Sequence, residues 1–136
     1  MSVKRFEFEP PFDDEVIIVE ATIANKYTFL LALDTAATHT TIDSNMLFLS
    51  GYELKNSNGE VEIETSNGIV VVETYDLDVF EYLEHKQEKF EVQVYDFLAH
   101  GILSDYHGVL GLDFLRNIPF CINVEEGWID IKIKKA

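Results

Sequence analysis

Residues 29–42 read FLLALDTAATHTTI, and the interpretation of the whole chain starts from this stretch. A short apolar run ends directly at Asp34. Four small residues follow it: Thr35, Ala36, Ala37 and Thr38. A carboxylate at the end of a buried strand costs free energy unless it is hydrogen-bonded, paired or used in chemistry. The stretch therefore predicts a strand over residues 27–33 and a turn that presents Asp34 at the floor of a cleft.

Most of the remaining chain alternates apolar and polar side chains with a period of two, which is typical of strands. The expected strands cover residues 15–23, 27–33, 40–42, 60–65, 69–80, 90–95, 120–124 and 128–133. Between the strands, turns are expected at residues 25–26, at 66–68, where Asn-Gly suits a tight hairpin, and at 84–87. These patterns predict an all-β protein whose sheet closes or folds over, so that the strand edges are hidden.

Two short helices complete the expected fold. Residues 44–49 follow Asp43, a good N-cap, and precede Gly51, which suits the end of a helix. Asp43 is therefore interpreted as a helix cap and not as a second functional acid. The other helix is expected over residues 112–117.

Length and composition narrow the class of protein. The 136 residues are 47% hydrophobic and 12% aromatic, which predicts one folded domain over residues 1–136. With 10 basic and 25 acidic residues the net charge is −15, which argues against binding nucleic acid or an anionic membrane. There is no signal-peptide pattern and no bilayer-length apolar run, so a cytoplasmic protein is expected. The lone Cys121 is expected to be buried and inert, and it excludes a Cys-rich metal site.

The stretch around Asp34 resembles the active-site loop of the aspartic proteases, in particular the retropepsin-like (retroviral-type) group. Two further motifs follow in the order that this family has. Residues 65–68 (TSNG) lie in the interval of the flap, the hairpin that closes over the substrate, and residues 108–115 (GVLGLDFL) resemble the apolar-apolar-Gly segment and the short helix after it. The likeness spans roughly residues 15–125. It implies a closed, mostly antiparallel β-barrel of the retropepsin-like acid protease type.

The resemblance also implies a reaction. Aspartic proteases hydrolyse peptide bonds with two carboxylates that share one proton. This chain has one such loop, so the resemblance implies a homodimer in which each copy contributes Asp34, without metal or organic cofactor. Thr35 would tie the two loops together near the axis, and Gly111 and Asp113 would support the active-site loop.

The substrate implied by the resemblance is a peptide or protein in extended form. The main chain of the substrate would bind the loop, and the hairpin would cover the substrate. The histidine after the loop would line one side-chain pocket. The residues concerned are Ala36, Ala37, Thr38, His39, Ser66, Asn67 and Gly68.

Several other interpretations stay open. Ala36 stands where the family usually has glycine, and a methyl group there could narrow the cleft. A retropepsin-like dimer that binds peptides without cutting them is therefore one alternative, and a monomeric barrel with an apolar cavity for a small molecule is another. Asp34 could also be a structural turn residue. The histidines at 100 and 107 are interpreted as solvated loop residues, because no metal-binding spacing occurs.

Overall fold

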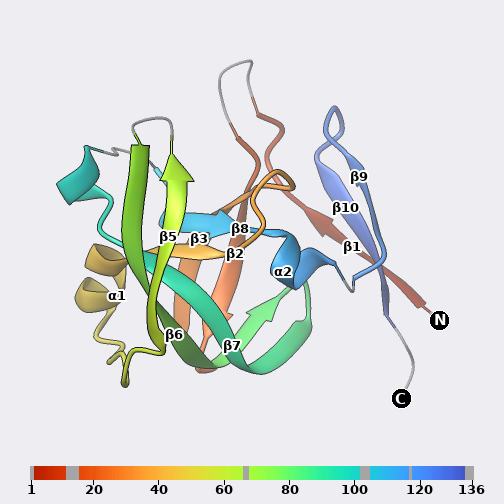
Figure 1. Cartoon of the computed structure of the whole chain (residues 1–136). Coiled ribbons are helices and arrows are strands. Elements are labelled where there is room, and N and C mark those ends of the chain that lie inside the picture. Colours follow the sequence, from red (N-terminus) through yellow and green to blue (C-terminus); the bar gives the residue numbers. More distant parts are fainter. Residues whose placement is uncertain (1, 12–15, 66–67, 102–104, 117, 134–136) are drawn as a thin grey trace.

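A closed barrel of six strands forms the centre of the molecule (Figure 1). The computed structural model describes residues 2–11, 16–65, 68–101, 105–116 and 118–133. Around the barrel the strands follow the order β2 (Ile18–Ile23), β3 (Tyr27–Leu33), β8 (Gly108–Leu110), β4 (Thr41–Asp43), β7 (His85–Tyr95) and β6 (Gly68–Tyr82). The barrel closes because β6 pairs back with β2, with Ala21 opposite Tyr82. The predicted fold class is confirmed; two pairings, β3 with β8 and β4 with β7, are parallel.

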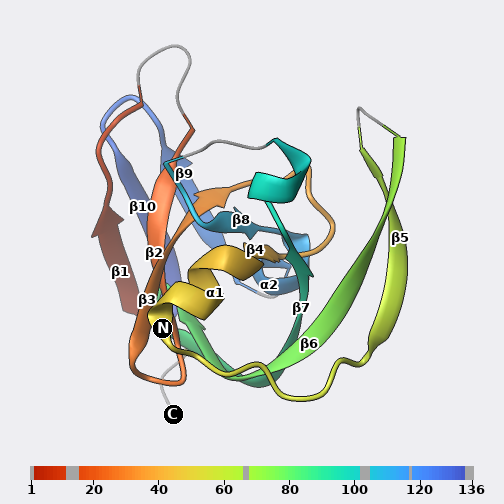
Figure 2. The ribbon, with the colours of Figure 1, turned by 90° about the vertical axis from the view of Figure 1, so that its left-hand side faces the viewer.

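A long hairpin extends from this barrel. Strand β5 (Gly59–Thr65) pairs with the first half of β6, and the two run away from the body of the protein (Figure 2). Thr65 and Gly68 are the last paired residues toward the hairpin tip. Ser66 and Asn67, which the resemblance places in the flap, lie outside the described residues. Within the described strands β5 ends the sheet, so its second edge has no partner strand.

A small second sheet lies beside the barrel. In it β10 (Trp128–Ile133) pairs on one side with β1 (Ser2–Glu7) and on the other with β9 (Phe120–Asn123). The last hairpin was predicted from the sequence, but β1 was not. Five of the six residues of β1 are exposed. Because neither face of this strand is fully buried, its sequence has no need to alternate apolar and polar residues, and the segment was not recognised as a strand. Its position is set by long-range contacts, among them a two-bond ion pair from Arg5 to Asp130 (2.7 and 2.9 Å).

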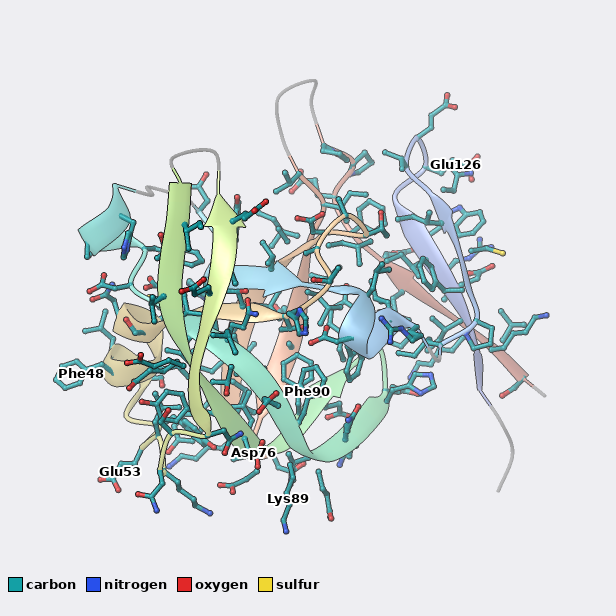
Figure 3. All side chains as sticks on the ribbon, in the orientation of Figure 1. Phe48, Glu53, Asp76, Lys89, Phe90 and Glu126 are labelled. Atoms are coloured by element: carbon teal, nitrogen blue, oxygen red, sulfur yellow. The ribbon has the colours of Figure 1, made fainter. Side chains whose placement is uncertain are left out.

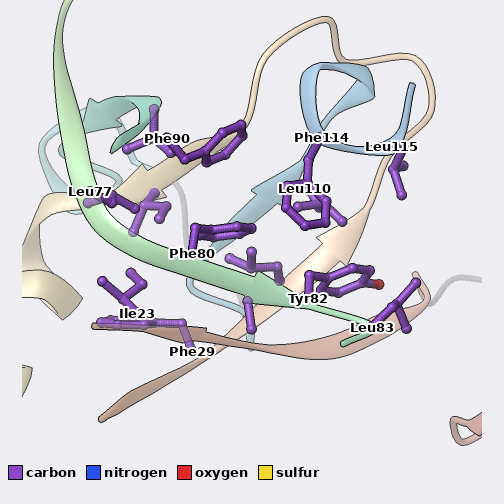
Figure 4. Packing of buried hydrophobic residues seen from close by; sticks show 14 of the residues in the cluster. Ile23, Phe29, Leu77, Phe80, Tyr82, Leu83, Phe90, Leu110, Phe114 and Leu115 are labelled. Carbon is purple, nitrogen blue, oxygen red and sulfur yellow. The ribbon is translucent and has the colours of Figure 1, made fainter. Parts of the chain in front are cut away.

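Aromatic rings fill the barrel (Figure 4). Phe80, Phe90 and Phe114 contact one another with ring centroids 4.9 to 5.5 Å apart, and Tyr82 packs edge-on against Phe114 at 6.0 Å. Around them lie aliphatic side chains such as Leu110, which is fully buried. Burial of such side chains is the main stabilising contribution to a fold of this size. In the described part of the chain the barrel interior is occupied by these side chains, which disfavours the small-molecule barrel.

The helices are short, as predicted. In α1 (Ser44–Ser50) the N-cap is Asp43, whose carboxylate accepts hydrogen bonds from the N–H groups of Asn45 and Phe97, both at 3.2 Å. Gly51 ends the helix with a φ of 87°, a conformation that glycine adopts without steric cost. The interpretation of Asp43 as a helix cap is confirmed. The other helical segments are η1 (Leu98–His100) and α2 (Leu112–Leu115).

Two sequence predictions are wrong in detail. The turn expected at residues 84–87 lies earlier, because Tyr82 pairs with His85 and leaves Leu83 and Glu84 as the turn residues, with φ of 51° and 64°. Without a glycine, this turn had no sequence signal. Cys121 is exposed and not buried, because it lies on the edge strand β9. No helix in the described ranges combines the length and the apolar character needed to cross a membrane.

Candidate active site

Asp34 follows the last residue of β3, next to the start of the α2 segment. Its N–H donates to the carbonyl of Leu110 on the neighbouring strand β8 (3.1 Å). Its own carbonyl accepts the N–H of Ala37 (3.2 Å), and its carboxylate oxygen Oδ1 accepts the N–H of Ala36 (3.0 Å). The side chain is half-buried. These bonds fix the carboxylate at the turn, and within the described chain its Oδ2 has no hydrogen-bond partner.

The loop after Asp34 is open to solvent on one side and packed on the other. Thr35, Ala36 and Thr38 are exposed, whereas the carbonyl of Ala37 accepts the N–H of Leu112 (2.8 Å). Ala36 is not among the residues with positive φ, so the loop has no backbone strain that only glycine could relieve. A methyl group at this position is therefore compatible with the loop conformation.

Gly111 lies directly behind the loop, in close contact with its backbone. A Cβ atom placed there would lie 2.7 Å from the carbonyl carbon of His39 and 2.9 Å from the carbonyl oxygen of Ala37. Both are backbone atoms, so they cannot rotate away from the contact. Its φ of −100° is open to any residue, so glycine is needed here for space and not for an unusual backbone conformation. Any side chain at this position would push the loop outward.

Asp113 binds the far end of the same loop. Its carboxylate accepts both the N–H of Thr40 (2.9 Å) and the Thr40 hydroxyl (2.8 Å). The hydroxyl in turn accepts the N–H of Gly111 (3.1 Å), and Thr40 is fully buried. Asp113 thus lies behind the loop, with its carboxylate directed at Thr40. Sequence reasoning missed Thr40, since its partner is 73 residues away along the chain.

A cleft of about 530 Å³ separates the loop from the hairpin. The loop forms one wall with residues 36–39, and β5 forms the opposite wall with residues 61–64. The floor comes from strands of the barrel: Thr41, Thr74, Glu91, Val92, Gln93 and Val109. Asp34 lies beside this cleft, two residues before Ala36, and does not line it. Gly68 begins β6 with a φ of 116°, in the same hairpin as the β5 wall.

Three histidines have distinct surroundings. His39 is exposed at the cleft, and its Nδ1 shares a hydrogen bond with the hydroxyl of Thr38 (2.9 Å). His100 is exposed and stacks on Tyr95 with 4.2 Å between ring centroids. The solvated interpretation of His107 is wrong. His107 is half-buried. Its ring Nδ1 accepts the backbone N–H of Leu30 (3.0 Å), and its backbone N–H donates to the carbonyl of Leu30 (2.6 Å). His107 therefore joins two segments that are distant in the sequence.

The described residues offer no metal centre: among them, no three His, Cys, Asp or Glu side chains gather in a way that could hold an ion. The site therefore consists of one carboxylate in a tight turn, a loop held from behind by Gly111 and Asp113, and a cleft next to it. This arrangement can hold an extended peptide beside a carboxylate.

Comparison with known protein families gives a match that covers this part of the chain. Residues 19–117 match the family described as "gag-polyprotein putative aspartyl protease". The chain belongs to this family. The matched residues include the Asp34 loop, the hairpin and the α2 segment. The predicted membership of the retropepsin-like protease family is confirmed.

Solved structures agree with the family. The crystal structure of a retropepsin-like aspartic protease from Rickettsia conorii superposes with a TM-score of 0.67 at 16% identity, covering 96% of this chain and 91% of that chain. At this identity the match shows a shared fold. No curated protein sequence matches the chain.

Proposed function

We propose that the chain is an aspartic endopeptidase that works as a homodimer, with one Asp34 from each copy in the active site. The observation that carries this proposal is the Asp34 turn in a chain of an aspartyl protease family. Two carboxylates are needed for the reaction, and one loop of this kind occurs here. A two-fold axis through paired loops brings identical carboxylates together. The cytoplasmic location expected from the sequence stays a prediction.

The chemistry follows from a carboxylate pair that holds one proton between its two members. The ionised Asp34 takes a proton from a water molecule, whose oxygen attacks the carbonyl carbon of the scissile peptide bond. The protonated Asp34 of the other copy donates a hydrogen bond to the carbonyl oxygen and stabilises the developing negative charge. The Asp34 that took the proton from water then donates it to the nitrogen of the tetrahedral intermediate, and the C–N bond breaks to release the amine and the carboxylic acid. Because one carboxyl must be ionised and one protonated, activity should follow a bell-shaped pH profile on the acidic side of neutral.

The other loop residues have supporting roles in this proposal. Thr35 is exposed in the single chain, so its hydroxyl is available to the loop of the second copy. Residues 36–38 supply backbone groups for an extended substrate, and His39 lines a side-chain pocket. Gly68, with Ser66 and Asn67, belongs to the hairpin proposed to cover the peptide. Gly111 and Asp113 hold the loop in position from behind.

Ala36 supports an alternative function. Its methyl group is exposed where the substrate would pass, and the family usually has glycine there. If the methyl group keeps the scissile bond away from Asp34, the dimer binds peptides without cutting them. The unstrained loop favours the protease, since the methyl group does not disturb the position of the carboxylate.

A digest of a diverse peptide mixture over acidic to neutral pH separates the two functions. The wild type should cleave peptides and be inhibited by pepstatin, whereas Asp34→Asn should fold normally and cleave nothing. Cleavage by the Asn variant at the wild-type rate would overturn the mechanism. If the wild type binds peptides without cleaving them and Ala36→Gly restores cleavage, the alternative function is correct.

A further inference from the structure

Buried polar residues of the described chain fall into two groups. Thr40 and Asp43 serve the fold, since Thr40 holds the Asp34 loop and Asp43 caps α1. Thr74 and Gln93 are also buried, at 7% and 8% exposure, and both line the floor of the cleft. Burying polar groups costs free energy unless they form hydrogen bonds. The second group therefore marks the floor as a place where hydrogen bonding to a ligand is useful.

Strand pairing arranges the floor as a row of polar side chains. Gln93 on β7 is the Cα partner of Thr41 on β4 and of Thr74 on β6. Residues directly opposite each other on neighbouring strands share one face of a sheet. All three residues line the cleft, so this face is the one that a bound peptide would meet.

The hydrogen bonds within the row determine what it can offer to a ligand. The Thr41 hydroxyl donates to the amide oxygen of Gln93 (3.2 Å), and the Thr74 hydroxyl donates to the carboxylate of Glu91 (3.3 Å). The first bond fixes the orientation of the amide. The two donors of the Gln93 NH2 group and lone pairs on both hydroxyls take no part in these two bonds. The floor is therefore suited to a group that both accepts and donates hydrogen bonds.

The same chemistry discriminates among substrate side chains. An aliphatic side chain would cover the floor without offering a hydrogen bond, which is costly for the polar groups beneath it. A carboxylate would be repelled by Glu91, which lines the same floor. Lysine and arginine carry donors only, so they offer no acceptor to the Gln93 amide. A neutral amide side chain has both an acceptor and donors and carries no charge.

We propose that this cleft selects substrates with asparagine or glutamine at the position directed at the floor, and that Gln93 sets the preference. Val61 and Ile63 of β5 share the face of Thr74 and Gln93, so they can pack against the carbon atoms of that side chain. The proposal rests on the proposed function, because it takes this cleft as the substrate site. It adds the class of side chain that the substrate carries there.

The test begins with the cleavage profile of a peptide library randomised around the scissile bond, in which asparagine and glutamine should be enriched at one position. Fluorogenic peptides that differ only at this position, with asparagine, leucine or lysine, are then compared. Wild type should cleave the asparagine peptide with the highest kcat/KM, about tenfold above that of the leucine peptide, because leucine has nearly the same size but leaves the polar floor without a partner.

Two variants assign the preference to the row. Gln93→Met keeps a long unbranched side chain without the amide, and it should cleave the leucine peptide at least as well as the asparagine peptide. Thr41→Val removes the bond that orients the amide and should lower the preference about threefold, which keeps the proposal testable if Gln93→Met does not fold. Gln87→Met is the matched control: it makes the same change on the same strand at an exposed position outside the cleft, and should keep the wild-type preference.

Three results would overturn the proposal: no position of the library at which the wild type prefers asparagine or glutamine, a lysine peptide that is cleaved best, or a wild-type preference in Gln93→Met. Failure of the proposed protease is recognised separately, by fluorescence anisotropy of peptides bound to Asp34→Asn, with the three side chains placed at each position in turn. Tighter binding of asparagine at one position would support the polar floor even if the wild type cleaves nothing. Binding without such a preference would contradict it, whether or not peptides are cleaved.

Discussion

Thr40→Val is the substitution whose effect follows most directly from the structure. The Thr40 hydroxyl donates to the Asp113 carboxylate (2.8 Å) and accepts the N–H of Gly111 (3.1 Å), and the residue is fully buried. Valine keeps the shape but loses a hydrogen bond to a charged group and leaves the Gly111 N–H without a partner. Together these losses should lower the free energy of unfolding by about 3 kcal/mol. For a chain of this length, that corresponds to a melting temperature lower by roughly 10 °C.

Thr41→Val is the matched control, because it is the same change at the next residue. The Thr41 hydroxyl has one described bond, to the side-chain oxygen of Gln93 (3.2 Å), and the residue is half-buried. Its loss should cost about 1 kcal/mol or less. Urea and thermal unfolding, compared at one protein concentration because a dimer gains stability with concentration, measure both variants. Equal losses in the two variants would refute the reasoning that the Thr40–Asp113 contact holds the loop.

Three further predictions concern other parts of the molecule. Gly111→Ala should shift the loop outward, because the added Cβ would lie 2.7 Å from the backbone of His39. In a peptide cleavage assay, kcat/KM should fall about a hundredfold. A variant with the kcat/KM of the wild type would contradict this packing. Leu47→Ala should lower the free energy of unfolding, measured with urea, by about 2–5 kcal/mol, because Leu47 is 1% exposed. Phe48→Ala should change it by no more than about 0.5 kcal/mol, because Phe48 points into solvent (Figure 3). Comparable losses in the two variants would argue against this orientation of α1. The hydrogen bond from Arg5 lowers the pKa of Asp130, so its contribution is present above the ordinary aspartate pKa and is lost as the pH falls through the lowered value. Arg5→Gln should therefore destabilise the protein more at pH 7 than at strongly acidic pH, where only the contact of Arg5 with the Trp128 ring is left to lose. An equal effect at both pH values would contradict this.

The parts of the fold that the sequence predicted correctly are those with local signals. The strand over residues 27–33 has the same bounds as β3, because its apolar run ends at a charged residue. Asp43 and Gly51 delimit α1 because capping depends on residues adjacent to the helix. In the candidate site, the Asp34 loop was found because carboxylate and small residues follow one another along the chain.

The features that sequence reasoning missed depend on contacts between distant residues. Strand β1 has little burial of its own and is positioned by partners more than a hundred residues away, such as Asp130. His107 meets Leu30 across 77 residues, so no local pattern marks it as structural. Gln93 is a polar residue between buried valines, and its position at the floor of the cleft depends on the pairing of β7 with β4 and β6, which are distant in the sequence.

Mixing chains tests the central claim, that a working site needs Asp34 from two copies. Wild-type and Asp34→Asn chains are mixed at equal concentration, allowed to exchange partners, and assayed for peptide cleavage at constant total protein. If both carboxylates are required, only the wild-type pairs are active, and random pairing leaves about one quarter of the wild-type activity. Activity of about one half, in proportion to the wild-type chains present, would show that each Asp34 works alone and would contradict the shared site.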